Sequence, residues 1–136
     1  MGRRQARQQA VRWLYEADVA KTNPQELVDR GAVGMRAEDR AFAEGLLLGV
    51  SQAQEELDAW LGRLAVDWRV ERMATVDRAI LRLGLYELQH RPDVPTAAIL
   101  TEAVELANVF STPEARRFIN GVLSRAAQEA RVNAAP

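Results

Sequence analysis

Apolar residues recur at helical spacing from one end of the chain to the other. On a helical wheel, residues 3–20 place their apolar members within one arc of about 100°. These members are Ala6, Ala10, Trp13, Leu14 and Ala17. A second arc of about 80°, well separated from the first, carries polar and aromatic side chains. These are Arg4, Gln8, Arg12 and Tyr15. The segment therefore predicts a helix with one core-facing stripe and one separate Arg/Gln/Tyr stripe.

The same period continues through the rest of the chain and is punctuated by helix-start and helix-stop signals. Asn23 followed by Pro24 is typical of a capped helix start, and Gly31 is typical of a helix end. Pro92 and Pro95 make residues 91–95 a loop. Thr75 is expected to cap the helix that follows it. The expected helices are residues 3–20, 24–30, 37–64, 70–73, 76–90, 96–109 and 113–131.

No segment alternates strictly between apolar and polar residues, so we predict an all-α fold of about seven helices. Residues 65–69 form a plausible joint between two small helical bundles, 1–64 and 65–136, packed into one domain. Gly121 continues a helical period, and we expect it to be a close-packing position, like Gly84. The expected core residues are Trp13, Leu14, Phe42, Leu46, Leu57, Leu81, Leu85, Val104 and Val122.

Composition narrows the class of protein. A chain of 136 residues corresponds to one domain with a sizeable core. The absence of Cys excludes a disulfide scaffold and Cys-ligated metals, and a single His excludes a His-rich metal site. Neither a signal peptide nor a membrane span is recognisable, so we expect a cytoplasmic protein.

The net charge of −1 conceals a basic N-terminal segment. Residues 1–15 contain four Arg and no acid, so the other residues carry a net charge of −5. The basic residues Arg3, Arg4, Arg7 and Arg12 lie near Gln8 and Tyr15. Guanidinium groups bind phosphates or stack on bases, and a Tyr ring adds a stacking surface. This combination is typical of RNA binding, although a solvated helix face has the same composition.

Other candidate sites have weaker signals. Arg117 and Phe118 lie in the first turns of the last helix, where phosphate is favoured, although Phe118 also follows the apolar period of the core. His90 lies at a helix C-terminus, where a capping role is typical. Glu102 and Glu105 share a helix face, and we expect ion pairs with Arg78 or Arg82. No arrangement of these residues predicts catalysis, so we expect no enzyme activity.

Strings of residues in chain order resemble the NusB family of transcription antitermination factors. They are RRQAR (3–7), AVRWLY (10–15), VDRAILRLGLYEL (76–88), DVP (93–95), TEAVELA (101–107) and FINGVL (118–123). The resemblance implies an all-helical bacterial protein that binds boxA-type RNA of nascent ribosomal transcripts. It also implies binding to NusE, a ribosomal protein of the small subunit, and assembly on RNA polymerase with other Nus factors. It implies no cofactor and no metal.

Matching positions carry the functional residues of the family onto this chain. The RNA face implied by the resemblance comprises Arg3, Arg4, Arg7, Gln8, Arg12, Tyr15, Arg117, Phe118 and Asn120. The implied NusE face includes Glu71 and Asp77, and at Asp77 the family often has Glu. We expect Arg4, Arg7, Glu71 and Asp77 to be exposed. The alternative function is a helical protein-interaction scaffold, or a homodimer that buries the Arg-bearing face, with no RNA role.

Overall fold

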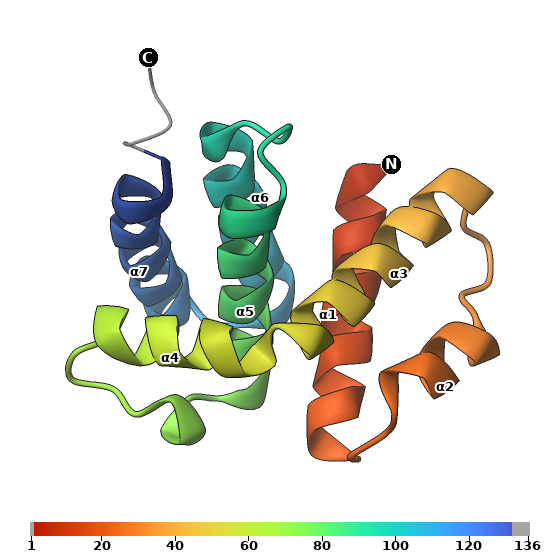
Figure 1. Ribbon diagram of the computed structural model, residues 1–136, viewed down its shortest axis with the longest axis horizontal. Helices are drawn as coiled ribbons and strands as arrows, with labels where there is room; N and C mark the ends of the chain where they lie inside the picture. Colours follow the sequence, from red (N-terminus) through yellow and green to blue (C-terminus); the bar gives the residue numbers. More distant parts are fainter. Residues whose placement is uncertain (1, 132–136) are drawn as a thin grey trace.

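Seven α-helices and one short 3-10 helix make up the secondary structure of residues 2–131, which are the residues described by the computed structural model (Figure 1). The helices are α1 (Arg3–Val19), α2 (Pro24–Arg30), α3 (Ala37–Gln52), α4 (Gln54–Leu64), η1 (Val70–Arg72), α5 (Thr75–His90), α6 (Thr96–Phe110) and α7 (Pro113–Arg131). This arrangement confirms the predicted all-α fold class.

Helix α5 is the central element of the fold. It packs against α1, α3 and α4 as well as against α6 and α7. Figure 1 shows α1, α2 and α3 on one side of the molecule and α5, α6 and α7 on the other, with α4 crossing below α5. The division into bundles of residues 1–64 and 65–136 stays a prediction, and α5 packs against helices from both.

Two helix starts have a side-chain cap, the one predicted at Asn23 and a second at the start of α7, whereas the cap predicted at Thr75 is absent. The side chain of Asn23 accepts a hydrogen bond from the Gln25 backbone N–H at 2.8 Å. Thr112 Oγ1 accepts one from the Ala115 backbone N–H at 3.1 Å at the start of α7. The capping role predicted for Thr75 is wrong, because α5 begins at Thr75 itself and its N-cap is Ala74, which has no capping side chain.

The single helix predicted over residues 37–64 is wrong, because the chain breaks at Ala53 between α3 and α4. The apolar period runs through the break because both helices bury a stripe: α3 buries Leu46 and Val50, and α4 buries Leu57 and Leu61. A straight helix over these residues would be about 42 Å long. Breaking it allows α4 to pack against α5 and α7.

The core contains eight of the nine side chains predicted for it. They are Trp13, Leu14, Phe42, Leu46, Leu57, Leu81, Leu85 and Val122. The prediction that Val104 is a core residue is wrong, because Val104 is only half-buried on α6. Gly84 is a close-packing position, because a Cβ there would lie 2.7 Å from Leu123 Cδ1. Gly121 is within α7 as predicted but is not closely packed, since the nearest side-chain atom to an added Cβ is Arg125 Nη1 at 3.9 Å.

Candidate nucleic-acid interface

Helix α1 presents most of the predicted basic stripe to solvent. Arg3, Arg4 and Arg12 are exposed, Tyr15 is 45% exposed, and Gln8 is half-buried. The opposite side of the helix is buried against α3 and α5 through Ala6, Ala10 and their neighbours. One face of the helix therefore displays Arg4, Gln8, Arg12 and Tyr15, and the exposed Arg3 lies apart from them at the N-terminal end.

Arg7 does not belong to this exposed face, and its prediction as an exposed residue is wrong. Its side chain is 6% exposed, and Nε and Nη2 donate to the two carboxylate oxygens of Glu87 at 2.8 and 2.7 Å. Burial lowers the pKa of the Arg7 guanidinium, but the hydrogen bonds and the charge of Glu87 outweigh this and raise it overall. The sequence did contain a signal, because Arg7, Val11 and Leu14 share one helical face at i, i+4 and i+7.

Arg4 is held by a carboxylate that lies far away in the sequence. Its Nε and Nη2 donate to Glu102 on α6 at 3.1 and 2.9 Å. Hydrogen bonding by Arg4 lowers the pKa of Glu102, and the same contact raises the pKa of Arg4. The predicted pairing of Glu102 with Arg78 or Arg82 is therefore wrong.

Arg78 and Arg82 pair with carboxylates other than Glu102. Arg78 Nη2 contacts Asp18 Oδ2 at 2.6 Å, and Arg82 Nε contacts Asp58 Oδ1 at 2.7 Å. These contacts join α5 to α1 and α4. Sequence periodicity shows which face a residue occupies but not which of several carboxylates it meets across helices.

At the N-terminal end of α1, cations gather around one aromatic ring. The Arg3 Cζ lies 3.9 Å from the centroid of Phe42, and the Cζ atoms of Arg7 and Arg91 each lie 5.3 Å from it. Arg91 comes from the loop between α5 and α6 and was not among the predicted site residues. Its place beside Phe42 of α3 depends on tertiary packing, which local sequence does not report.

At the other end of α1, Arg12 and Tyr15 border an apolar hollow of about 380 Å³. Its other lining residues are Val11, Val76 and Phe110. The Arg12 Cζ lies 5.5 Å from the centroid of the Phe110 ring, a cation–π contact. An exposed guanidinium beside two aromatic side chains provides both a phosphate contact and surfaces for base stacking.

The second predicted basic spot is at the start of α7. Arg117 and Asn120 are exposed, and Phe118 is half-buried. The Phe118 ring packs on the core and also against Trp68, with ring centroids 5.6 Å apart and planes inclined by 60°. Trp68 lies in the segment between α4 and η1, and no sequence motif had marked it.

The two predicted partner residues differ in their surroundings. Glu71 is exposed, and its pKa is lowered by a hydrogen bond from its own backbone and by Arg69, whose Nη2 is 3.1 Å away. Asp77 is half-buried, which corrects the expected exposure, and accepts a hydrogen bond from Ser111 Oγ at 2.5 Å. Asp77 and Phe118 both line an apolar hollow at the start of α7. The predicted RNA and partner residues therefore meet at this point.

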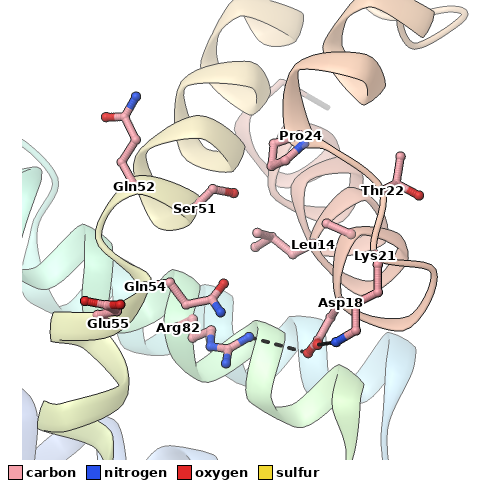
Figure 2. A pocket seen from close by; sticks show the side chains of 11 residues that line it. Leu14, Asp18, Lys21, Thr22, Pro24, Ser51, Gln52, Gln54, Glu55 and Arg82 are labelled. Atoms are coloured by element: carbon pink, nitrogen blue, oxygen red, sulfur yellow. Dashed lines mark hydrogen bonds and ion pairs between the residues drawn. The ribbon is translucent and has the colours of Figure 1, made fainter.

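None of the predicted contact residues lines a separate polar hollow of about 520 Å³ between α1 and the α3–α4 junction (Figure 2). Figure 2 shows Asp18 beside Lys21, with Ser51, Gln54 and Arg82 across the hollow and the Arg82 guanidinium pointing toward Asp18. The Asp18 carboxylate contacts the guanidinium of Arg82 at 3.4 Å, so the two charges are already paired.

Residues 2–131 contain no group of three or more His, Asp or Glu side chains placed to hold a metal ion. His90, the last residue of α5, stacks on Tyr86 with ring centroids 4.8 Å apart, and its Nε2 lies 3.6 Å from Glu56 Oε1. Within the same range, no helix is both long enough and apolar enough to cross a membrane.

The fold and this surface define a class of small all-helical proteins with a cationic, aromatic-flanked face suited to an anionic partner. The chain belongs to the NusB family, whose model matches residues 4–128. Curated relatives carry the name transcription antitermination protein NusB. The one from Rubrobacter xylanophilus is 46% identical over 123 residues, covering 90% of this chain and 88% of the relative. The one from Desulforamulus reducens is 40% identical over 127 residues, covering 92% and 89%.

Solved structures agree with this assignment. A structure of NusB from T. maritima has a TM-score of 0.89 and 26% identity, covering 98% of this chain and 96% of that one. A structure described as antitermination factors NusB and NusE in complex with dsRNA has a TM-score of 0.83 and 26% identity, covering 93% and 96%. The resemblance read from the sequence is thereby confirmed.

Proposed function

We propose that this protein is an RNA-binding transcription antitermination factor of the bacterial cytoplasm. It binds boxA-type RNA of nascent ribosomal transcripts together with NusE, and it joins RNA polymerase with other Nus factors. The observation that carries the proposal is the face of α1 that presents Arg4, Gln8, Arg12 and Tyr15, with the exposed Arg3 at the N-terminal end of the same helix. The NusB relatives and the solved NusB–NusE–RNA assembly support it.

The residues on α1 divide the work of binding. Arg3, Arg4 and Arg12 contact phosphates, which fixes the position of the strand without selecting its sequence. Gln8 offers amide hydrogen bonds, and Tyr15 offers a ring on which a base stacks. Arg7 acts indirectly, because its ion pair with Glu87 fixes α1 on α5.

The start of α7 extends the same surface. Arg117 supplies a further cation, Phe118 a ring edge, and Asn120 a side-chain amide. For NusE, we propose contacts with Glu71 and Asp77, whose carboxylates complement a basic ribosomal protein. No step of this function requires a catalytic residue, a metal or a cofactor.

Two matched variants test the two contact sets. Arg3→Glu combined with Arg12→Glu should abolish binding of a fluorescein-labelled boxA-type RNA in an anisotropy titration and leave NusE binding unchanged. Glu71→Lys should weaken NusE binding and leave RNA binding without NusE near wild type. Arg63→Glu on α4, where the side chain is exposed, is the control for charge reversal away from both sets.

The alternative function makes a different forecast. If the Arg face serves only self-association, the double variant changes the sedimentation coefficient, and wild-type protein shows no RNA binding at low salt. That result would overturn the proposed function. Loss of NusE binding in the Arg variant, with RNA binding kept, would overturn the assignment of the two contact sets.

A further inference from the structure

Trp68 has no role in the site described so far, and its surroundings are unusual. The other two tryptophans, Trp13 and Trp60, are 4% and 8% exposed, whereas Trp68 is 58% exposed. Large aromatic side chains bury most of their surface when packing alone determines their position. An exposed indole held against another ring therefore indicates a contact surface.

The indole forms one wall of an apolar hollow of about 250 Å³. Phe118 lines it as well, with its ring centroid 5.6 Å from that of Trp68. Met73, Ala74 and Ala115 supply further apolar lining. The hollow thus combines two aromatic rings with an aliphatic surface, as sites that hold a flat, unstacked base do.

The polar groups around the hollow select among occupants. Arg72 lines it and is exposed, and the exposed Arg117 adjoins Phe118 in α7. Both are suited to the phosphates that flank a base. The carboxylate of Glu114 lines the hollow and can accept hydrogen bonds from the N–H groups on a base edge. Asp77 lines the hollow too, where it accepts a hydrogen bond from Ser111 Oγ and marks the border with the proposed NusE contacts. The mixed charge of the lining suits a base flanked by phosphates.

The hollow also continues the surface of α1. Val76 and Phe110 line the hollow beside Tyr15, and their near neighbours Asp77 and Thr112 line the hollow beside Trp68. The two hollows are therefore adjacent across the start of α5 and the turn between α6 and α7. An RNA strand that leaves Tyr15 in this direction arrives at Trp68.

We propose that Trp68, together with Phe118, stacks on an unpaired base of the bound RNA and extends the RNA face from α1 across α7. This inference rests on the proposed function and adds to it a contact residue from the segment between α4 and η1. Stacking on an aromatic ring tolerates any base, so Trp68 adds affinity and position more than sequence selection.

Tryptophan emission and RNA anisotropy together test the proposal. Titrating wild-type protein with boxA-type RNA should quench the emission of the exposed Trp68, with the same midpoint as the anisotropy of the labelled RNA. Trp68→Phe should lose the quenching, because the buried Trp13 and Trp60 remain as reporters, and should bind RNA within about threefold of wild type. Trp68→Leu keeps an apolar side chain without a ring and should weaken binding about tenfold, or about 1.4 kcal/mol.

Val66→Ala, in the same segment and exposed, is the matched control and should bind RNA as wild type does. Circular dichroism melts report whether Trp68→Leu still folds. If it does not fold, the proposal is tested by whether RNA quenches the emission of wild type but not that of Trp68→Phe. RNA binding with no quenching and no loss in Trp68→Leu overturns this inference alone. Quenching by NusE in place of RNA assigns the hollow to the protein partner and overturns it too. Absence of RNA binding by wild type overturns the proposed function together with the inference.

Discussion

Arg7 and Glu87, which are 80 residues apart, form a two-point ion pair in the interior, with N–O distances of 2.8 and 2.7 Å. Their side chains are 7% and 2% exposed, so the pair replaces hydration almost completely. It connects the only buried arginine of α1 to the central helix α5. An arginine that looks like part of an RNA-binding stripe therefore serves to fix the helix that carries the stripe.

Removing one partner of this pair should be much more damaging than removing both. Arg7→Met leaves the Glu87 carboxylate buried without a partner and should lower the free energy of unfolding by about 3–5 kcal/mol. Arg7→Met with Glu87→Leu should recover most of that loss, because two apolar side chains of similar volume then pack together. Urea denaturation of the single and double variants measures the difference.

The same double variant separates the structural role of Arg7 from a direct RNA contact. If Arg7 acts only through α1, the folded double variant binds boxA-type RNA with wild-type affinity and wild-type salt dependence. A reduced salt dependence in that variant would return Arg7 to the set of phosphate contacts.

The exposed arginines of α1 should determine part of the salt dependence of RNA binding. Each phosphate contact on a single strand contributes about 0.7 to the slope of log K against log salt concentration. Replacing Arg3, Arg4 and Arg12 by Gln together should therefore reduce the slope by about 2. Arg63→Gln should leave it unchanged. Anisotropy titrations across a series of salt concentrations provide the slopes, and an unchanged slope in the triple variant would contradict the phosphate contacts.

The Arg4–Glu102 pair should make stability depend on acid pH. Arg4 holds the pKa of Glu102 below its ordinary value, so the folded state binds a proton at this site less readily than the unfolded state. The stabilisation is fully present above the ordinary Glu pKa of about 4.3 and is lost as pH falls through the lower, folded value. Glu102→Gln should flatten the fall in melting temperature below about pH 4.3. Equal slopes in the two proteins would show that the pair is broken in solution.

Replacing Gly84 or Gly121, which both lie within helices, by Ala should change the free energy of unfolding in opposite directions. Gly84→Ala places a Cβ 2.7 Å from Leu123 Cδ1, and Leu123 is fully buried, so we expect a loss of about 1–3 kcal/mol in unfolding free energy. Gly121→Ala meets no side-chain atom closer than 3.9 Å and should gain up to about 1 kcal/mol from helix propensity. Thermal melts of both variants measure these effects. A stabilised Gly84→Ala would mean that Leu123 moves aside without cost.

Local pattern in the sequence determined most of the helices. The apolar stripe of α1, the Asn23 cap and the loop at residues 91–95 all follow from the side chains of a few neighbouring residues. Helical periodicity and end signals act over one or two turns, so a single sequence reports them directly. Spacing and residue type also marked the basic stripe of α1 and the Arg117–Phe118 pair, and the family motifs added Asn120, Glu71 and Asp77.

Tertiary structure decided where the long helix breaks and which side chains meet between helices. The break at Ala53 arises because α4 packs beneath α5, although the apolar period continues without interruption. Arg7 points inward because it pairs with Glu87 on α5, and Arg4 pairs with Glu102 on α6. Trp68 and Phe118 met across 50 residues of chain. The periodicity of one helix gives the direction in which a side chain points. It does not give the group that the neighbouring helix places there. That group determines whether an arginine binds a carboxylate inside the protein or a phosphate outside it.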